Sequence, residues 1–263
     1  MPFAAAAAWT MGATLLLDLL RLALARDLVG SVLCQAAAYL LVVFLVLRFH
    51  APEANLQSFL ALRRAHLAFY PIAAALGAAL FVVSEAILEF MQRRYPEPGD
   101  DDTSFYELLH GPIYMRIAVG IAIIAVGPLV EEVLFRGALF RPLERRYAKA
   151  RSIVIGMTAA LFAVAHLSWQ LTAHLFVAGC ALGFLRQASG SISPTLLTHA
   201  TYNAIPFFII LLDRSGPEAV AAQTLPHWLI AVSAASALAL LGLAHLVSTR
   251  TGAAEGAEDL ERP

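Results

Sequence analysis

Two adjacent carboxylates and an arginine stand in an otherwise apolar stretch of the sequence. Arg136 lies four residues after Glu132, and Glu131 directly precedes Glu132. Residues four apart on a helix share a face, so Glu132 and Arg136 can form an ion pair. Glu131 is rotated by about 100° from Glu132 around the helix axis and faces elsewhere. The spacing therefore predicts that Glu132 is tied to Arg136, while Glu131 is free to act as an acid or a base.

Two histidine motifs follow at helical spacing. Phe162 and His166 are four residues apart, and so are His199 and Asn203. Each pair projects from one face of its helix, and all four side chains can converge with Glu131 if the three helices are neighbours. One motif alone is also compatible with a purely structural role, since an ion pair or a hydrogen-bonded histidine can hold the helices of a bundle together. The combination on three helices favours a site, because each buried polar group must be satisfied separately.

The composition places these polar residues in a membrane. The chain has 263 residues, of which 60% are hydrophobic and 14% charged, and its mean hydropathy is +0.72. Soluble domains carry about 25% charged residues, and a soluble fold of this length could not hide so much apolar surface. The formal net charge of −1 gives no attraction toward nucleic acid. Ionisable residues inside membrane helices are costly, which makes the three motifs functional candidates.

The apolar stretches predict an all-α, polytopic integral membrane helix bundle with about eight transmembrane helices. A helix needs about 20 apolar residues to cross the hydrocarbon core. The first stretch holds Asp18 and Arg21, and it could instead lie in the interface as an amphipathic helix. Pro128 lacks a backbone N–H and is expected to kink the fourth span just before the two acids. The expected spans are 9–25, 28–47, 66–91, 114–141, 152–169, 172–188, 194–213 and 226–247.

The basic residues predict the orientation of the bundle. A positive cluster at 141–151 and the connections near 48–64 and 186 fall on one side of an eight-span arrangement. That side should face the cytoplasm, together with both termini. Lys149 is the single lysine among 18 basic residues. This arginine bias is typical of GC-rich coding and indicates a bacterial source, so we expect the protein in a bacterial inner membrane.

The apolar stretches and the polar end divide the chain into four regions. We expect the N-terminal membrane helices in 1–113 and a catalytic membrane core in 114–213. The polar, acidic end is typical of a disordered tail. The last membrane helix is then expected in 214–248, and the tail in 249–263.

The three motifs, taken in order, resemble a known family. Glu131-Glu132-x-x-x-Arg136, Phe162-x-x-x-His166 and His199-x-x-x-Asn203 are similar to the CPBP group, the CAAX-protease and bacteriocin-processing family also called Abi. Its eukaryotic members include CAAX prenyl protease 2. The resemblance covers about 115–210, including Gly179-x-x-x-Gly183 and the Ser189-Gly190-Ser191-Ile192 stretch. It implies a glutamate-type intramembrane endopeptidase that cleaves membrane-anchored protein or peptide substrates without a cofactor.

The resemblance also implies a role for each motif residue. Glu131 would be the general base that activates a water, and His166 would help to hold and polarise that water. His199 and Asn203 would form the oxyanion hole. These roles are physically reasonable, because a carboxylate in a low-dielectric pocket can serve as a base, and prepositioned donors stabilise an oxyanion. The side chains that would support the site structurally are Glu132, Arg136 and Phe162.

Two other interpretations remain open at this point. The first is a zinc-dependent intramembrane metalloprotease with Glu131, His166 and His199 as ligands, although the compact His-Glu-x-x-His pattern is missing. The second is a non-catalytic membrane scaffold or bacteriocin-immunity protein, in which the polar cluster is only structural. The roles of three further residues are also left open: His174, Glu85 and Glu89.

Overall fold

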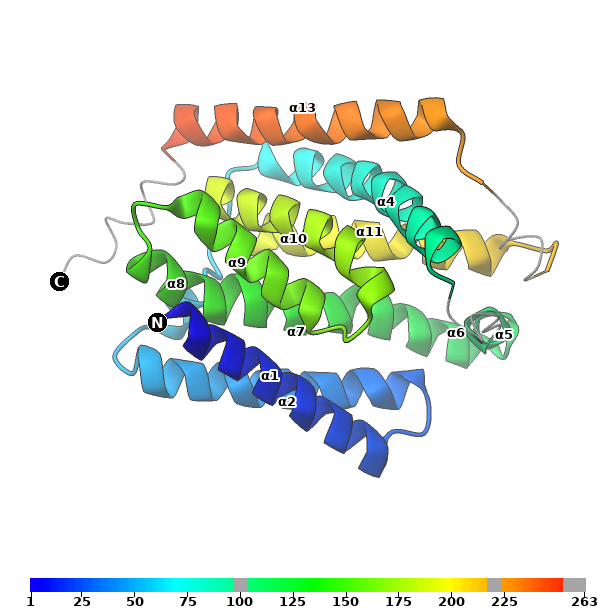
Figure 1. Cartoon of the computed structure of the whole chain (residues 1–263), viewed down its shortest axis with the longest axis horizontal. Coiled ribbons are helices and arrows are strands. Elements are labelled where there is room, and N and C mark those ends of the chain that lie inside the picture. The colour runs from blue at the N-terminus through cyan, green and yellow to red at the C-terminus, as the bar shows by residue number, and fades with distance from the viewer. Residues whose placement is uncertain (97–103, 217–223, 253–263) are drawn as a thin grey trace.

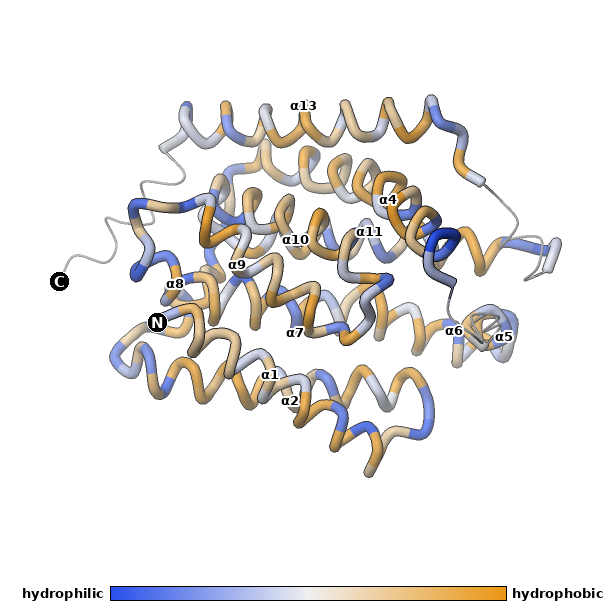
Figure 2. The backbone as a smooth tube through the Cα atoms, viewed as in Figure 1, coloured by the Kyte–Doolittle hydropathy of each residue, from blue (hydrophilic) through white to orange (hydrophobic). Residues whose placement is uncertain are grey.

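Helices lying side by side make up the whole of the described structure (Figure 1), a computed structural model that describes residues 1–96, 104–216 and 224–252. Within these ranges there is no strand, and seven helices are long and apolar enough to cross a membrane. Figure 2 shows their apolar character along most of their length. They are α1 (Phe3–Leu24), α2 (Leu28–His50), α4 (Phe69–Arg94), the segmented helix Ile113–Arg146, α10 (Trp169–Ser189), α11 (Ser193–Leu212) and α13 (His227–Thr251).

The predicted all-α membrane bundle is confirmed, but one expected span is wrong. The segment 152–169 forms α9 (Arg151–Val164), which has 14 residues and is only about 21 Å long at 1.5 Å per residue. That is shorter than the hydrocarbon core of about 30 Å. The helix ends because Leu167 takes a positive φ of 52° and Ser168 caps the next helix through the N–H of Leu171. The doubtful first span, by contrast, is the continuous helix α1.

Helices α9 and α10 pack against each other as a hairpin, so the chain returns to the end of the bundle where α9 begins. The beginning of α1 and the end of α13 consequently lie at the same end of the bundle (Figure 1). The amino group of Met1 donates a hydrogen bond of 2.9 Å to the carbonyl of Pro142 there. Most of the expected tail, 253–263, and the acidic stretch at 100–102 lie outside the described residues.

The helix that carries the two acids contains two π-helical segments. It runs through α6 (Ile113–Gly120), the π-helix η1 (Ile121–Val126), α7 (Gly127–Glu132), the π-helix η2 (Val133–Leu139) and α8 (Phe140–Arg146). At Gly127 the backbone N–H bonds to the carbonyl of Ala122, five residues back. The expected disturbance at Pro128 is thus a widened turn directly before α7, and π-turns of this kind are frequent at functional sites.

Helix α11 is held close to α4 and to the loop before it. A Cβ atom at Gly77 would lie 2.5 Å from the carbonyl oxygen of Thr198, so the two helices touch through this glycine. The turn between α10 and α11 is bound to the segment after the short helix α3 (Leu56–Phe59). Arg63 donates to the carbonyl of Gly190 at 2.7 Å, and Ile192 donates to that of Ala61 at 3.2 Å. These contacts fix the start of α11, which carries His199.

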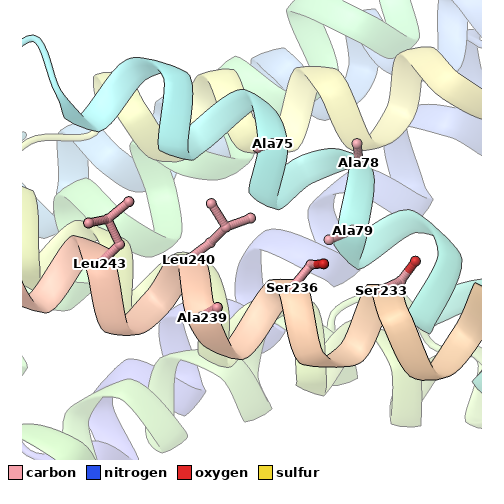
Figure 3. Close-up of a pocket in the computed structure, with 8 residues that line it drawn as sticks. All are labelled: Ala75, Ala78, Ala79, Ser233, Ser236, Ala239, Leu240 and Leu243. Atoms are coloured by element: carbon pink, nitrogen blue, oxygen red, sulfur yellow. The ribbon is translucent and has the colours of Figure 1, made fainter.

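Helix α13 lies on the outside of α4 and meets it through small side chains. A groove of about 620 Å³ runs between the two helices (Figure 3). None of the motif residues lines it, so this groove does not contain the predicted site. Its lining residues are Ala75, Ala78, Ala79, Ser233, Ser236, Ala239, Leu240 and Leu243.

Candidate active site

The ring of Phe162 brings the three motifs together. Phe162 is almost fully buried, and the guanidinium carbon of Arg136 lies 4.5 Å from its ring centroid. The imidazole of His166 meets the same ring edge-on at a centroid distance of 5.0 Å. The imidazole of His199 does so at 5.8 Å. Helices that are far apart in the sequence therefore converge on one interior point, as the motif spacing predicts.

Glu132 and Arg136 form an ion pair that is fully shielded, with both side chains 0% exposed. The Nη1 of Arg136 donates to Oε1 of Glu132 at 3.0 Å, and its Nη2 donates to the carbonyl of Gly179 on α10 at 3.2 Å. A Cβ atom at Gly179 would lie 3.0 Å from Ala159 of α9. The arginine thus joins its own helix to the α9–α10 hairpin, and the pairing reduces the free-energy cost of two charges in the membrane.

The imidazole of His199 lies between the two adjacent carboxylates. Its Nδ1 is 3.1 Å from Oε1 of Glu132, which is hydrogen-bond distance. Its Nε2 is 3.6 Å from Oε2 of Glu131, which is too long for a direct hydrogen bond. An ionised carboxylate only accepts, so Nδ1 carries the proton toward Glu132. The other ring nitrogen then faces the second carboxylate.

Glu131 has a hydrogen-bond partner that sequence reasoning missed. The Nε2 of Gln35, on α2, donates to Oε1 of Glu131 at 2.7 Å, and both side chains are buried. The sequence predicts only that Glu131 is not the carboxylate tied to Arg136, and it does not identify the amide donor. A signal was present in the sequence, because Gln35 is a lone amide in a long apolar stretch. The other oxygen, Oε2, remains directed toward His199.

Asn203 binds the backbone of the helix that carries the acids. Its Nδ2 donates to the carbonyl of Ile123 at 3.0 Å. In an α-helix this carbonyl would accept from Gly127, but the N–H of Gly127 is used by Ala122. The next residue that could donate in the π register is Pro128, which has no N–H. The π-turn therefore leaves the carbonyl of Ile123 without a backbone donor, and Asn203 supplies one. The second amide hydrogen of Nδ2 remains for another acceptor.

His166 sits half-buried at the end of α9. Its Nδ1 donates to the carbonyl of Phe162 at 2.9 Å, because a carbonyl oxygen can only accept. In the neutral ring, Nε2 then carries the lone pair and can accept a hydrogen bond from a water. The early end of α9 thus places a polar ring in the interior of the bundle.

The three residues whose roles were left open have different surroundings. His174 is buried, its Nδ1 has no hydrogen-bond partner among the described residues, and it interacts electrostatically with His166. Glu89 forms an ion pair with Arg93. Glu85 is on the same helix as Glu89 and interacts electrostatically with it.

The donor set of the zinc alternative is not assembled in the part of the chain that the structure describes. No group of three or more His, Cys, Asp or Glu side chains is placed there to hold a metal ion. Glu131, His166 and His199 are not grouped in this way among the described residues.

A narrow cavity borders the imidazole of His199. It offers about 10 Å³, which is at the lower limit of what a cavity needs to hold one water molecule. Phe162 and His199 form one part of its wall, and the rest is mostly apolar. The other lining residues are Leu80, Leu175, Ala178, Leu182, Thr198 and Tyr202.

The bundle and its buried carboxylate–histidine cluster define a polytopic membrane protein with a site suited to hydrolysis. Residues 113–205, which are 93 of the 263 residues, match the family model Rce1-like, described as type II CAAX prenyl endopeptidase Rce1-like. This match confirms the resemblance inferred from the three motifs. This segment is thus similar to the CAAX-type endopeptidases, a family of peptide-bond hydrolases.

The matched segment contains all seven motif residues, whereas Gln35 lies outside it. No curated protein and no solved structure matches the chain significantly.

Proposed function

We propose that the protein is a glutamate-type intramembrane endopeptidase that cleaves membrane-anchored protein or peptide substrates. One observation carries the proposal: the buried carboxylate of Glu131 has one oxygen held by Gln35 and the other directed at His199. A carboxylate with one oxygen fixed and the other open toward a polar partner is suited to take a proton from a water molecule.

In the proposed reaction, Oε2 of Glu131 removes a proton from a water molecule as the water oxygen attacks the peptide carbonyl. The free Nε2 of His166 accepts a hydrogen bond from the other O–H of that water and orients it. The new C–O bond gives a tetrahedral intermediate. Glu131 then returns the proton to the leaving nitrogen as the C–N bond breaks, so that the products are a carboxylic acid and an amine and the carboxylate of Glu131 is regenerated. The new acid releases its proton to water after the products leave.

The developing oxyanion requires donors, and we assign them to His199 and Asn203. The Nδ2 of Asn203 has one hydrogen left after its bond to Ile123. His199 can donate from Nε2 when the ring is protonated, and Nδ1 then still donates to Glu132. Donors that packing fixes in advance stabilise the transition state without reorganisation. The proposed mechanism uses only side chains and needs no cofactor.

The distribution of basic residues between the two ends of the bundle supports an orientation in the membrane. We propose that the end where the chain starts and α13 finishes faces the cytoplasm, because the cluster Arg141, Arg145, Arg146, Lys149 and Arg151 lies at the adjoining connection. We place the protein in the lipid bilayer of a bacterial inner membrane.

Comparison of membrane proteomes tests the proposed function. Wild-type protein and the Glu131→Gln variant are expressed in the same host, and the new protein termini in the membrane fractions are quantified. Glu85→Gln serves as the matched control, because Glu85 is another acid in a membrane span and is not part of the motifs. We expect a set of new termini with wild type and Glu85→Gln that is lost with Glu131→Gln. The same termini with Glu131→Gln would contradict the proposal.

A further inference from the structure

Gln35 is a buried polar side chain in the mostly apolar helix α2. It is 9% exposed and lies in the first half of α2. An amide group buried in an apolar medium is strongly destabilising unless it forms a hydrogen bond. Its presence therefore calls for a partner, and the partner is the carboxylate of Glu131, 96 residues further along the chain.

Two neighbours border the amide of Gln35 in the interior of the bundle. Tyr39 lies one helical turn further on α2, is 2% exposed, and interacts with both Gln35 and Glu131. The ring of Tyr39 is itself packed edge-on against Phe135, at a centroid distance of 6.1 Å. On the other side, a Cβ atom at Gly127 would lie 4.0 Å from Oε1 of Gln35. The amide is thus enclosed between its own helix and the start of α7.

We propose that Gln35 is a positioning residue for Glu131. Its bond to Oε1 leaves Oε2 as the oxygen that takes the proton from water. This inference rests on the proposed function, since it assumes that Glu131 is the base. A hydrogen bond to an ionised acceptor is about twice as strong as a neutral one, so it can prevent rotation of the carboxylate. The orientation of Oε2 toward His199 is kept in this way.

The amide is chemically suited to this task. It donates a hydrogen bond without bringing a second charge into the membrane, whereas a lysine or arginine at this position would form an ion pair with the base. The catalytic arrangement therefore extends beyond the matched segment 113–205 into the N-terminal helices, and α2 contributes directly to it.

Kinetics of a Gln35→Met variant test the inference. Methionine keeps the length and unbranched shape of glutamine but has no N–H donor. The protein is reconstituted in lipid vesicles with a reporter substrate that carries a cleavage site identified in the membrane proteome. We expect kcat to fall about 10- to 100-fold, the size expected when a reacting group is misplaced by about 1 Å. KM should stay close to that of wild type.

Two controls separate a positioning role from a structural one. Cys34→Ala changes the neighbouring buried residue of α2 and should leave kcat unchanged. The KM of Gln35→Met in the same assay is the second control, because a general distortion of the site would raise KM together with the fall in kcat. If Gln35→Met is too unstable to purify, Gln35→Leu provides the same test, since leucine is also apolar and has no hydrogen-bond donor.

The outcomes distinguish this inference from the proposed function. A wild-type kcat for both Gln35 variants, with an inactive Glu131→Gln, overturns the positioning role and leaves the proposed function intact. A fall in the kcat of Cys34→Ala as large as that of Gln35→Met also overturns it. An active Glu131→Gln removes the proposed function itself.

Discussion

The Nδ1 of His199 lies 3.1 Å from Oε1 of Glu132, an oxygen that also accepts a hydrogen bond from Arg136 at 3.0 Å. The carboxylate in the ion pair and the histidine assigned to the oxyanion are therefore parts of one network. Glu132 fixes which ring nitrogen of His199 carries the proton, and Arg136 fixes Glu132. A supporting residue in this protein consequently controls the chemistry of a residue on another helix.

Removal of the arginine should destabilise the bundle strongly. Arg136→Met leaves the carboxylate of Glu132 buried and without its counter-charge, and breaking a buried pair in this way costs about 3–5 kcal/mol. Thermal unfolding of the purified variant in detergent measures the effect. The double variant Arg136→Met with Glu132→Leu should recover much of the loss, because no isolated charge remains. Equal stability of the single and double variants would show that the pair is not what stabilises this region.

The contact between Asn203 and Ile123 should depend on Pro128. Asn203→Ala leaves the carbonyl of Ile123 without a donor, which costs about 1–3 kcal/mol. In a Pro128→Ala background, the new N–H at position 128 can bind that carbonyl in the π register, and the same substitution should cost clearly less. A double-mutant cycle on unfolding free energies measures this coupling. An unchanged cost in the two backgrounds would contradict the explanation of the π-turn.

The glycine between α4 and α11 should tolerate no side chain. The Cβ of a Gly77→Ala variant would lie 2.5 Å from the carbonyl of Thr198, so α11 must move and carry His199 with it. We expect a loss of about 1–3 kcal/mol in stability, the usual range for overpacking, and a lower kcat. Gly156→Ala is the matched control, because no atom lies within 4 Å of its new Cβ. Equal effects of the two substitutions would argue against the close approach.

Removal of metal ions should leave the activity intact. The proposed mechanism uses Glu131 and two histidines as acid, base and hydrogen-bonding groups. Protein stripped with a chelator, with its residual metal content measured, should cleave the reporter at the wild-type rate. Loss of activity on chelation that added zinc restores would instead support the metalloprotease.

The sequence was sufficient to predict the contacts that follow from helical spacing. The Glu132–Arg136 pair depends on residues four apart, and the gathering of three motifs at Phe162 depends on which helix faces carry polar groups. The early end of α9 was missed, because it depends on one positive φ at Leu167 in a stretch that is apolar throughout.

Two further features could not be read from periodicity. The contact between Gln35 and Glu131 joins helices 96 residues apart, and nothing in the spacing along one helix reports on it. The role of Asn203 depends on the π-turn at Gly127, where the hydrogen-bond register of the backbone shifts by one residue. Such a shift leaves the amino-acid pattern of the helix unchanged, although Pro128 marks its place.

A single turnover in water labelled with oxygen-18 tests the central claim that Glu131 activates water rather than attacking the substrate itself. Enzyme in excess cleaves the reporter once, and mass spectrometry then locates the label. We predict one labelled oxygen in the new carboxylate of the product and none in the peptide that contains Glu131. Label in the Glu131 peptide, together with an unlabelled product carboxylate, would show a covalent acyl intermediate and contradict the account.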